Sequence, residues 1–419
     1  MNDTALRFRI RNTASGILDS ISENTALGYK TLYANTGTGN TALGFRSLAL
    51  NTSGSQNVAI GDSALYTNKT IGGLVAVGYN ALAKSKAGDY STAVGYAALA
   101  VDTTGQFNTA VGAYALNSNA KGIANTAVGA ASLSSVTTGG FNTALGQAAL
   151  YLHVKNGNNT AVGSNALQND TTGFNNTAVG LSSMLNNTNG FDNSALGRES
   201  LKNHSNNNNN TAIGSLAMSN DLTGSENTGI GYAALNVNTT GQFNTALGAN
   251  ADVASNNLSN ATAIGYRARV GQSNSMVLGS ISGVNGAVND TKVGIGTTTP
   301  NTSLHVDGSL SIGISMGIAG GASGSPVSLL NYKTYLGLSP ADNTNNNYQL
   351  PSPVTYPGRM YIIRNNSPAF NAVLSTAAGS LYPGSSDIGI ATYTLNPTTS
   401  VKTVMVISDG TNWTIMKQD

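Results

Sequence analysis

The chain repeats one pattern of polar and apolar positions every 17 residues. Starting at Gly44, a glycine recurs at this interval as far as Gly265, and Gly28 precedes the series by 16 residues. In all fifteen units the residue before the glycine is Leu, Val or Ile, and we call this position the aliphatic column. The residue two before the glycine, the alanine column, is Ala in every unit except at Gly229. A repeat this strict predicts stacked copies of one structural unit.

Each unit is predicted to form one coil of a β-solenoid. Seventeen residues are too few for a two-helix repeat, which needs more than about thirty. The TAVG core that ends at Gly112 carries β-branched residues, which favour strands. Connectors such as residues 102–105 (DTTG) are turn sequences. We therefore expect a short strand, a bend at the glycine, a second short strand and a polar turn in every coil.

The two columns before the glycine must face opposite sides of the strand, because successive side chains alternate. We expect the aliphatic residue to fill its own coil and the small alanine to lie against a neighbouring copy of the rod. The reverse arrangement stays open, with alanine in a narrow interior and the aliphatic residue facing the partner chain. Both arrangements predict packing between chains through this strand. The residues assigned to this packing and to the coil are Ala42, Leu43, Gly44, Ala59, Ile60, Gly61, Ala127, Val128 and Gly129.

Two further columns carry candidate chemistry. The residue four before the glycine, the asparagine column, is Asn in twelve of the fifteen units. Stacked Asn side chains form amide ladders and tolerate turn geometry, which we prefer to a sugar-binding role. Aromatic residues follow some of the glycines and are expected to cover that corner of the coil. They are Tyr29, Phe45, Tyr79, Tyr96 and Tyr232.

The repeats resemble the head repeats of YadA-like trimeric autotransporter adhesins. The resemblance is greatest in residues 263–271 (AIGYRARVG) followed by residues 275–279 (SMVLG), which have the 14-residue spacing of that family. It extends from about Asn24 to Ser282. It implies a left-handed parallel β-roll assembled as a homotrimer. The coiled-coil stalk and membrane barrel of that family have no counterpart in this sequence.

The segments that flank the repeats are similar to those of phage-type tail-fibre proteins and of large bacterial surface proteins. Residues 292–300 (KVGIGTTTP) and 304–308 (LHVDG) carry this resemblance after the repeats. Before them, residues 6–11 (LRFRIR) alternate apolar and basic residues, as in a strand or an attachment segment. The combination of these flanking segments with the repeats favours a fibre protein over an autotransporter.

We divide this all-β chain into four parts. Residues 1–22 form an N-terminal cap or attachment segment, 23–282 the β-roll repeats, 283–328 a neck, and 329–419 a small C-terminal β domain. In the last part, residues 401–407 and 412–416 flank Ser408, Asp409 and Gly410, which predicts a β-hairpin. Exposed aromatic residues often anchor binding surfaces, although a small β domain also needs them in its core. The receptor-binding candidates are Tyr356, Tyr382, Tyr393 and Trp413.

Composition excludes several classes of protein. The 419 residues contain no Cys, so neither a disulfide framework nor a thiolate metal site is expected. The net charge of +2 gives no electrostatic case for nucleic acid or membrane as a partner. We expect neither a signal peptide nor a membrane helix in the printed residues. The three histidines, His153, His204 and His305, are too scattered to build a metal site or a catalytic triad.

The sequence therefore predicts a structural, non-enzymatic, extracellular fibre that attaches to a surface receptor. A host-surface glycan or protein is the expected receptor, and a particle baseplate or anchoring protein is the expected partner of the N-terminus. No catalytic, cofactor or metal residue is proposed. A secreted bacterial surface adhesin is the alternative, and a fibre-borne glycan hydrolase is the third hypothesis. Which end attaches and which end binds is left open by the sequence.

Overall fold

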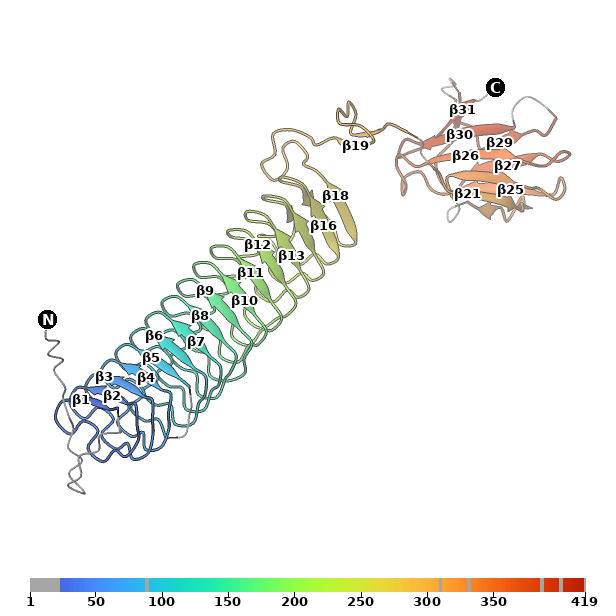
Figure 1. Ribbon diagram of the computed structural model, residues 1–419. Helices are drawn as coiled ribbons and strands as arrows, with labels where there is room; N and C mark the ends of the chain where they lie inside the picture. Colours follow the sequence, from blue (N-terminus) through green and yellow to red (C-terminus); the bar gives the residue numbers. More distant parts are fainter. Residues whose placement is uncertain are drawn as a thin grey trace. The chain divides into compact units, whose positions relative to one another are not determined.

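The computed structural model describes residues 23–86, 90–308, 311–329, 333–384, 388–398 and 402–417. The proposed N-terminal segment 1–22 lies outside these residues. The chain divides into two compact units, the first up to Gly294 with Thr298–His305, the second Ile295–Thr297 with Val306–Asp419. Every regular element in the described residues is a β-strand (Figure 1).

The first unit is a parallel β-solenoid with one short strand in each 17-residue coil, as the sequence predicts. The strands form a single 16-stranded sheet in the order β1 to β14, then β16 and β18. Each pairs in parallel with the next, and equivalent residues face each other, as in Ala110↔Ala127. The strands are β1 Thr25–Leu27, β2 Thr41–Leu43, β3 Val58–Ile60, β4 Val75–Val77, β5 Thr92–Val94, β6 Thr109–Val111, β7 Thr126–Val128, β8 Thr143–Leu145, β9 Thr160–Val162, β10 Thr177–Val179, β11 Ser194–Leu196, β12 Thr211–Ile213, β13 Thr228–Ile230, β14 Thr245–Leu247, β16 Ala261–Ile264 and β18 Ser275–Leu278.

The sequence predicted a second short strand in each coil, and this prediction is wrong for most of the solenoid. The residues four after the glycine, from Leu32 to Leu235, are Leu or Met with left-handed φ values near +50°. An extended strand requires negative φ, so this stretch winds as a turn instead. It still bonds to the next coil, for example from Leu48 N to the Ala64 carbonyl at 3.0 Å. Only the last coils gain a second strand, β15 (Asp252–Val253) paired with β17 (Arg269–Val270).

This left-handed column explains a sequence preference. Val and Ile never occupy it from Leu32 to Leu235, although both are common in the aliphatic column. β-Branched side chains are the least tolerant of a left-handed backbone, whereas Leu and Met are unbranched at Cβ. The column is buried and, with the alanine column, forms one continuous core. The two turns with Met, at Met184 and Met218, are equally buried.

The repeat glycines stack on one another at a corner of the coil, as the sequence predicts. Gly44 and Gly61 both have φ near +129°, a conformation that L-residues with side chains avoid. A Cβ atom added to Gly44 would lie 2.6 Å from the carbonyl oxygen of Gly61. Glycine is therefore required by backbone conformation and by the close approach of the next coil.

The second unit packs two small sheets around one core. The first has the order β21-β24-β26-β30-β31-β28, and the second has β22-β25-β27-β29 with β23 beside β25. The predicted hairpin is present, because β30 and β31 pair antiparallel. Their strands are β21 Ile314–Ile318, β22 Gly321–Ala322, β23 Val327–Ser328, β24 Tyr335–Leu338, β25 Asn345–Leu350, β26 Met360–Asn365, β27 Ala372–Thr376, β28 Leu381–Pro383, β29 Thr392–Leu395, β30 Thr403–Ser408 and β31 Trp413–Lys417; β19 Val293–Ile295 and β20 Leu304–Val306 pair separately.

The β sheets of this unit begin before Leu329, the residue at which the sequence places the start of the domain. β21 pairs with β24, and both β22 and β23 pair with β25. The Gly- and Ser-rich stretch assigned to the neck therefore supplies strands to both sheets. Its small residues fit between strands, as at Gly320, where an added Cβ would lie 2.5 Å from the Asn345 carbonyl oxygen.

Candidate functional site

The outer face of the long sheet carries an apolar stripe. The aliphatic column points away from the coil interior, and Leu43, Val128 and Leu247 are 43%, 38% and 45% exposed. Because equivalent residues of successive coils are paired in register, these side chains form one row along the sheet. Thr occupies most positions two before them, on the same face. We call this row, from Leu27 to Leu278, the outer stripe.

The preferred assignment of the alanine column is wrong. Ala42, Ala59 and Ala127 are at most 1% exposed and lie in the interior of the coil, whereas Leu43, Ile60 and Val128 face outwards. The interior is narrow because the left-handed Leu column fills it from the opposite side. The placement of alanine inside the coil and of the aliphatic residue outside agrees with the alternative left open by the sequence, so any packing between chains through this strand would use the aliphatic residues.

The C-terminal aromatic candidates do not form one surface. Trp413 is completely buried, and its Nε1 donates to the Pro351 carbonyl at 2.9 Å. Its assignment to receptor binding is therefore wrong. Tyr393 packs against the same core. Tyr356 is half-buried beneath the Arg359 guanidinium, 5.2 Å from the ring centroid, and Tyr382 is half-buried in β28.

The asparagine column is an internal ladder rather than a sugar-binding surface. The Asn125 Oδ1 accepts from the backbone N–H of Asn142 at 3.0 Å, and the Asn125 Nδ2 donates to the Gly139 carbonyl at 2.8 Å. The same bonds recur at Asn159 and Asn176. These side chains are buried and satisfy backbone groups that the turns leave unpaired. Direct amide–amide bonds of the predicted ladder occur at some steps, as from Asn142 Nδ2 to Asn125 Oδ1 at 3.1 Å, whereas most bonds of the column go to the backbone.

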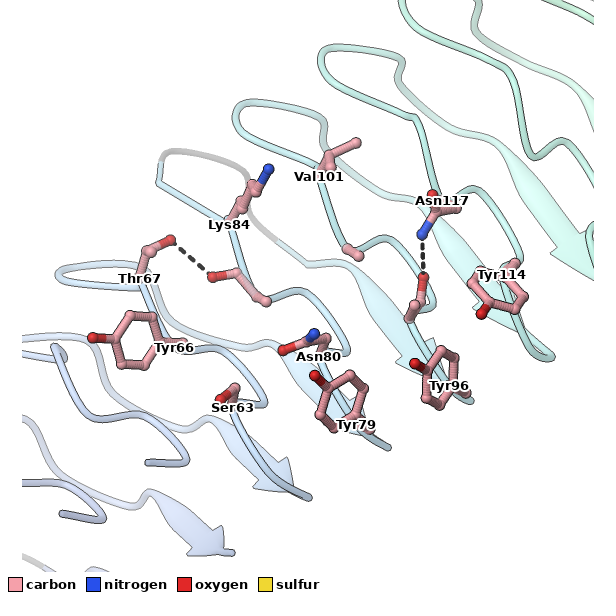
Figure 2. Close-up of a pocket in the computed structure, with 13 residues that line it drawn as sticks. Ser63, Tyr66, Thr67, Tyr79, Asn80, Lys84, Tyr96, Val101, Tyr114 and Asn117 are labelled. Carbon is pink, nitrogen blue, oxygen red and sulfur yellow. Dashed lines mark hydrogen bonds between the residues drawn. The ribbon is translucent and has the colours of Figure 1, made fainter. Parts of the chain in front are cut away.

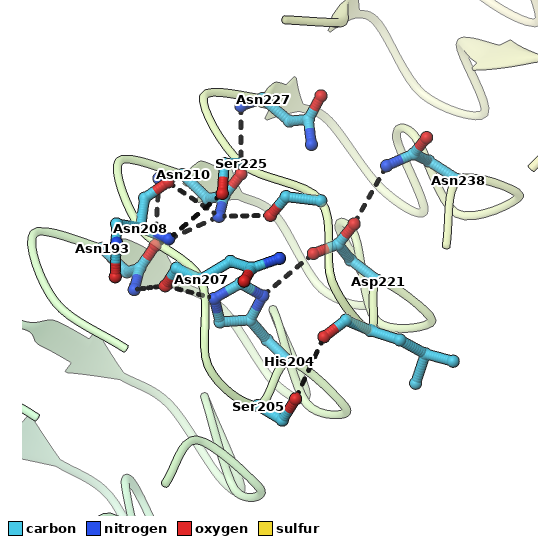
Figure 3. Close-up of polar contacts among 12 residues, drawn as sticks. Asn193, His204, Ser205, Asn207, Asn208, Asn210, Asp221, Ser225, Asn227 and Asn238 are labelled. Carbon is cyan, nitrogen blue, oxygen red and sulfur yellow. Dashed lines mark hydrogen bonds and ion pairs between the residues drawn. The ribbon is translucent and has the colours of Figure 1, made fainter. Parts of the chain in front are cut away.

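A second buried column, seven residues after the glycine and polar in most coils, was not identified from the sequence. It includes Asn51, Asn68, Asp102, His153 and His204. Two sets of three residues in this column, each a His, an Asp and an Asn from successive coils, make the same contacts. The His204 Nδ1 lies 2.9 Å from Asp221 Oδ2, and Asn238 Nδ2 donates to Asp221 Oδ1 at 2.9 Å (Figure 3). The corresponding group three coils earlier is His153, Asp170 and Asn187.

These histidines are structural, because both their ring and the facing carboxylate are inaccessible to solvent. Burial raises the pKa of Asp221 above its usual value, and the hydrogen bond and charge of His204 oppose that rise. The His204 Nε2 lies 2.8 Å from the Asn207 carbonyl, an acceptor, so this nitrogen carries a proton.

Asp102 occupies the same column without a histidine. Its Oδ1 accepts from the Gly105 N–H at 2.7 Å, but its Oδ2 has no hydrogen-bond partner among the described residues. Burial raises the pKa of Asp102 to about 6, against opposing hydrogen bonds from Gly105 and Asn119. At neutral pH the fold therefore carries a buried, uncompensated carboxylate, where Asn68 and Asn119 show that an amide fits.

We expect Asp102→Asn to stabilise the solenoid at pH 7.5 by up to about 3 kcal/mol, since one pKa unit corresponds to about 1.4 kcal/mol. The folded-state pKa lies above the unfolded value, so the wild type gains stability as the pH falls from above 6 towards 4. The variant lacks this gain, and its advantage should disappear near pH 4. Urea unfolding at both pH values measures this. Asp62→Asn, at an exposed position, is the control, and equal effects of both substitutions would contradict the prediction.

A groove of about 570 Å³ crosses the outer surface of coils three to six and is lined by tyrosine (Figure 2). Tyr79 and Tyr96 stack with ring centroids 5.0 Å apart, and Tyr114 meets Tyr96 edge-on at 5.2 Å. The nearby Tyr114 phenol, with partial burial, raises the pKa of Tyr96. Tyr79 and Tyr96 follow the repeat glycine directly and were predicted to cover the corner of the coil, whereas Tyr66 and Tyr114 belong to other columns of the repeat and were not predicted.

Other chemistry is sparse in the part of the chain that the structure describes. No group of three His, Asp or Glu side chains there is arranged to hold a metal ion. Nor does that part contain a helix long and apolar enough to span a membrane. No known protein family matches the chain, and no curated protein is significantly similar to it in sequence.

Proposed function

We propose that this chain is the subunit of an extracellular homotrimeric fibre that reaches from an anchored end to a surface receptor. The outer stripe carries the proposal. A continuous apolar row of this length on a soluble protein marks an interaction surface. The three-chain stoichiometry follows the resemblance of the repeats to trimeric adhesin heads.

A second copy of the same chain is the occupant that fits the stripe. The stripe repeats with the spacing of the coils over sixteen strands. Apolar residues of two partners lie opposite one another along the whole stripe only if both partners repeat them with the same spacing. A second copy of this chain has the same spacing because it has the same sequence. Cyclic assembly of identical subunits is also the commonest arrangement of soluble oligomers.

The free energies involved show why the full length of the outer stripe is needed for assembly. Covering each half-exposed aliphatic side chain contributes on the order of 1 kcal/mol, or roughly 15 kcal/mol along one face. Association costs about 4 to 15 kcal/mol in lost freedom and ordering. A few coils would contribute too little to offset this cost, whereas the whole stripe contributes as much as the upper end of that range.

We expect the triple variant Val111→Lys, Val128→Lys and Leu145→Lys to remain folded but to lose assembly. The three positions are consecutive in the outer stripe, so three charges would be buried at every interface without partners. Native mass spectrometry should give three chains for the wild type and mainly one for the variant. Circular dichroism should be unchanged, because these side chains point away from the core.

The matched control places lysines on the same coils but in the polar turn. Thr104→Lys with Thr138→Lys, beside the native Lys121, gives three exposed lysines at equivalent positions. This variant should assemble as the wild type does. A monomeric wild type, or full assembly of the stripe variant, would refute the homotrimer.

A further inference from the structure

The tyrosine groove is confined to a few coils although the fold repeats throughout. Tyr79, Tyr96 and Tyr114 are 45%, 49% and 48% exposed. The position of Tyr79 and Tyr96 is held by Ala113 and Ala130 in the next two coils, which have the same backbone. The coil therefore folds without an aromatic residue there. The clustering of tyrosines is a property of this surface and not a requirement of the solenoid.

The rest of the lining mixes five polar residues with small apolar ones, Ala83, Ala97, Ala100 and Val101, and includes no carboxylate. The Asn80 and Asn117 amides and the Ser63 and Thr67 hydroxyls lie beside the rings, and Lys84 is the one charged residue in the lining (Figure 2). The Asn117 Nδ2 donates to the Ala97 carbonyl at 2.9 Å, which fixes the orientation of this amide in the groove lining. The groove thus combines the exposed edges and outer faces of the tyrosine stack with amide, phenol and hydroxyl oxygens that can accept hydrogen bonds.

We propose that this groove binds an oligosaccharide of pyranose sugars lying along the solenoid axis. Sugar rings present apolar C–H faces, which pack on aromatic rings, and hydroxyl edges, which bond to amides and phenols. Lys84 would meet a uronic acid carboxylate. Peptides recognised through backbone pairing fit less well, because the sheet strands here already pair on both sides.

This inference names a receptor class for the proposed attachment function and places recognition on the solenoid rather than at the C-terminal unit. It does not depend on assembly, since no residue of the outer stripe lines the groove. An interface built on the stripe therefore uses different side chains from those that would contact the sugar.

The test is to measure binding of the full chain to an array of immobilised hexasaccharides of glucose, galactose, N-acetylglucosamine and galacturonic acid. Calorimetry then gives the affinity for each hexasaccharide that binds. We expect binding to at least one of them. Tyr79→Ala with Tyr96→Ala should weaken it at least about tenfold, the loss of roughly one aromatic contact per ring. Lys84→Ala should weaken only the uronic acid ligand.

Tyr232→Ala is the matched control, because Tyr232 occupies the same position of its coil but lies outside the groove. It should leave affinity unchanged. Absence of binding to the whole panel, or equal binding by the double tyrosine variant, would overturn the inference. Native mass of the same samples reports on assembly separately, so failure of sugar binding and failure of the homotrimer are distinguishable.

Discussion

Gly129→Ala should destabilise the solenoid by more than about 4 kcal/mol, the range in which backbone strain and steric overlap add. The φ of Gly129 is +129°, and a Cβ there would lie 2.6 Å from the Gly146 carbonyl oxygen. Relief of that overlap requires the two coils to separate. Separation weakens the bond from Gly146 N to the Val128 carbonyl, now 2.8 Å, and its neighbours along the turn.

The defect should spread from this corner because each coil contacts only its neighbours. Limited proteolysis is expected to cut near Gly129 and leave the coils on each side as separate protected fragments. Urea unfolding monitored by circular dichroism gives the loss of stability. Gly271→Ala is the control, since nothing lies within 4 Å of its added Cβ and its φ is not left-handed. Equal sensitivity at both glycines would rule out close coil contact as the cause.

The spacing and composition of the repeat were sufficient to predict the stacked strands and the glycine corner. They were not sufficient to decide which side of the strand faces inwards, because alternation fixes only that Ala127 and Val128 point in opposite directions. The residue four after the glycine determines which side faces inwards, because its side chain fills the coil interior opposite the alanine column. At Gly229 an added Cβ would lie 2.8 Å from Met218 Cγ, which shows how closely that column approaches the alanine column.

The turn that replaces the expected second strand had a detectable signal. The absence of Val and Ile at the position of Leu48 and its equivalents marks a left-handed backbone, but single-residue propensities favour neither turn nor strand for Leu. The buried polar column was missed for a different reason. Asn51, Asp102 and His153 resemble ordinary turn residues in sequence, and only the stacked coils show that they face inwards. Trp413 was misjudged because its partner, the Pro351 carbonyl, is distant in sequence.

The second large effect is expected at the buried pair of His204 and Asp221. His204→Ala should cost about 3 to 5 kcal/mol at pH 7.5, the usual penalty for leaving one charge of a buried pair unmatched. The Asp221 carboxylate would keep its bond from Asn238 but lose the imidazole at 2.9 Å. His153→Ala, in the equivalent group three coils earlier, should give a similar loss and serves as an internal replicate.

The double variant His204→Asn with Asp221→Asn should recover most of the lost stability, because neighbouring amides already bond in this column. Asn68 Nδ2 donates to Asn51 Oδ1 at 3.2 Å one coil apart.

The pH dependence of the stability of His204→Ala supplies a second criterion. In His204→Ala the folded-state pKa of Asp221 stays raised by burial with no histidine to oppose it, so the variant regains stability as the pH falls and the carboxyl takes up a proton. Urea unfolding at pH 7.5 and 4.5 should therefore show a smaller penalty at the lower pH. A penalty of equal size at both pH values would mean that the lost packing of the ring, and not the unmatched charge, sets the cost.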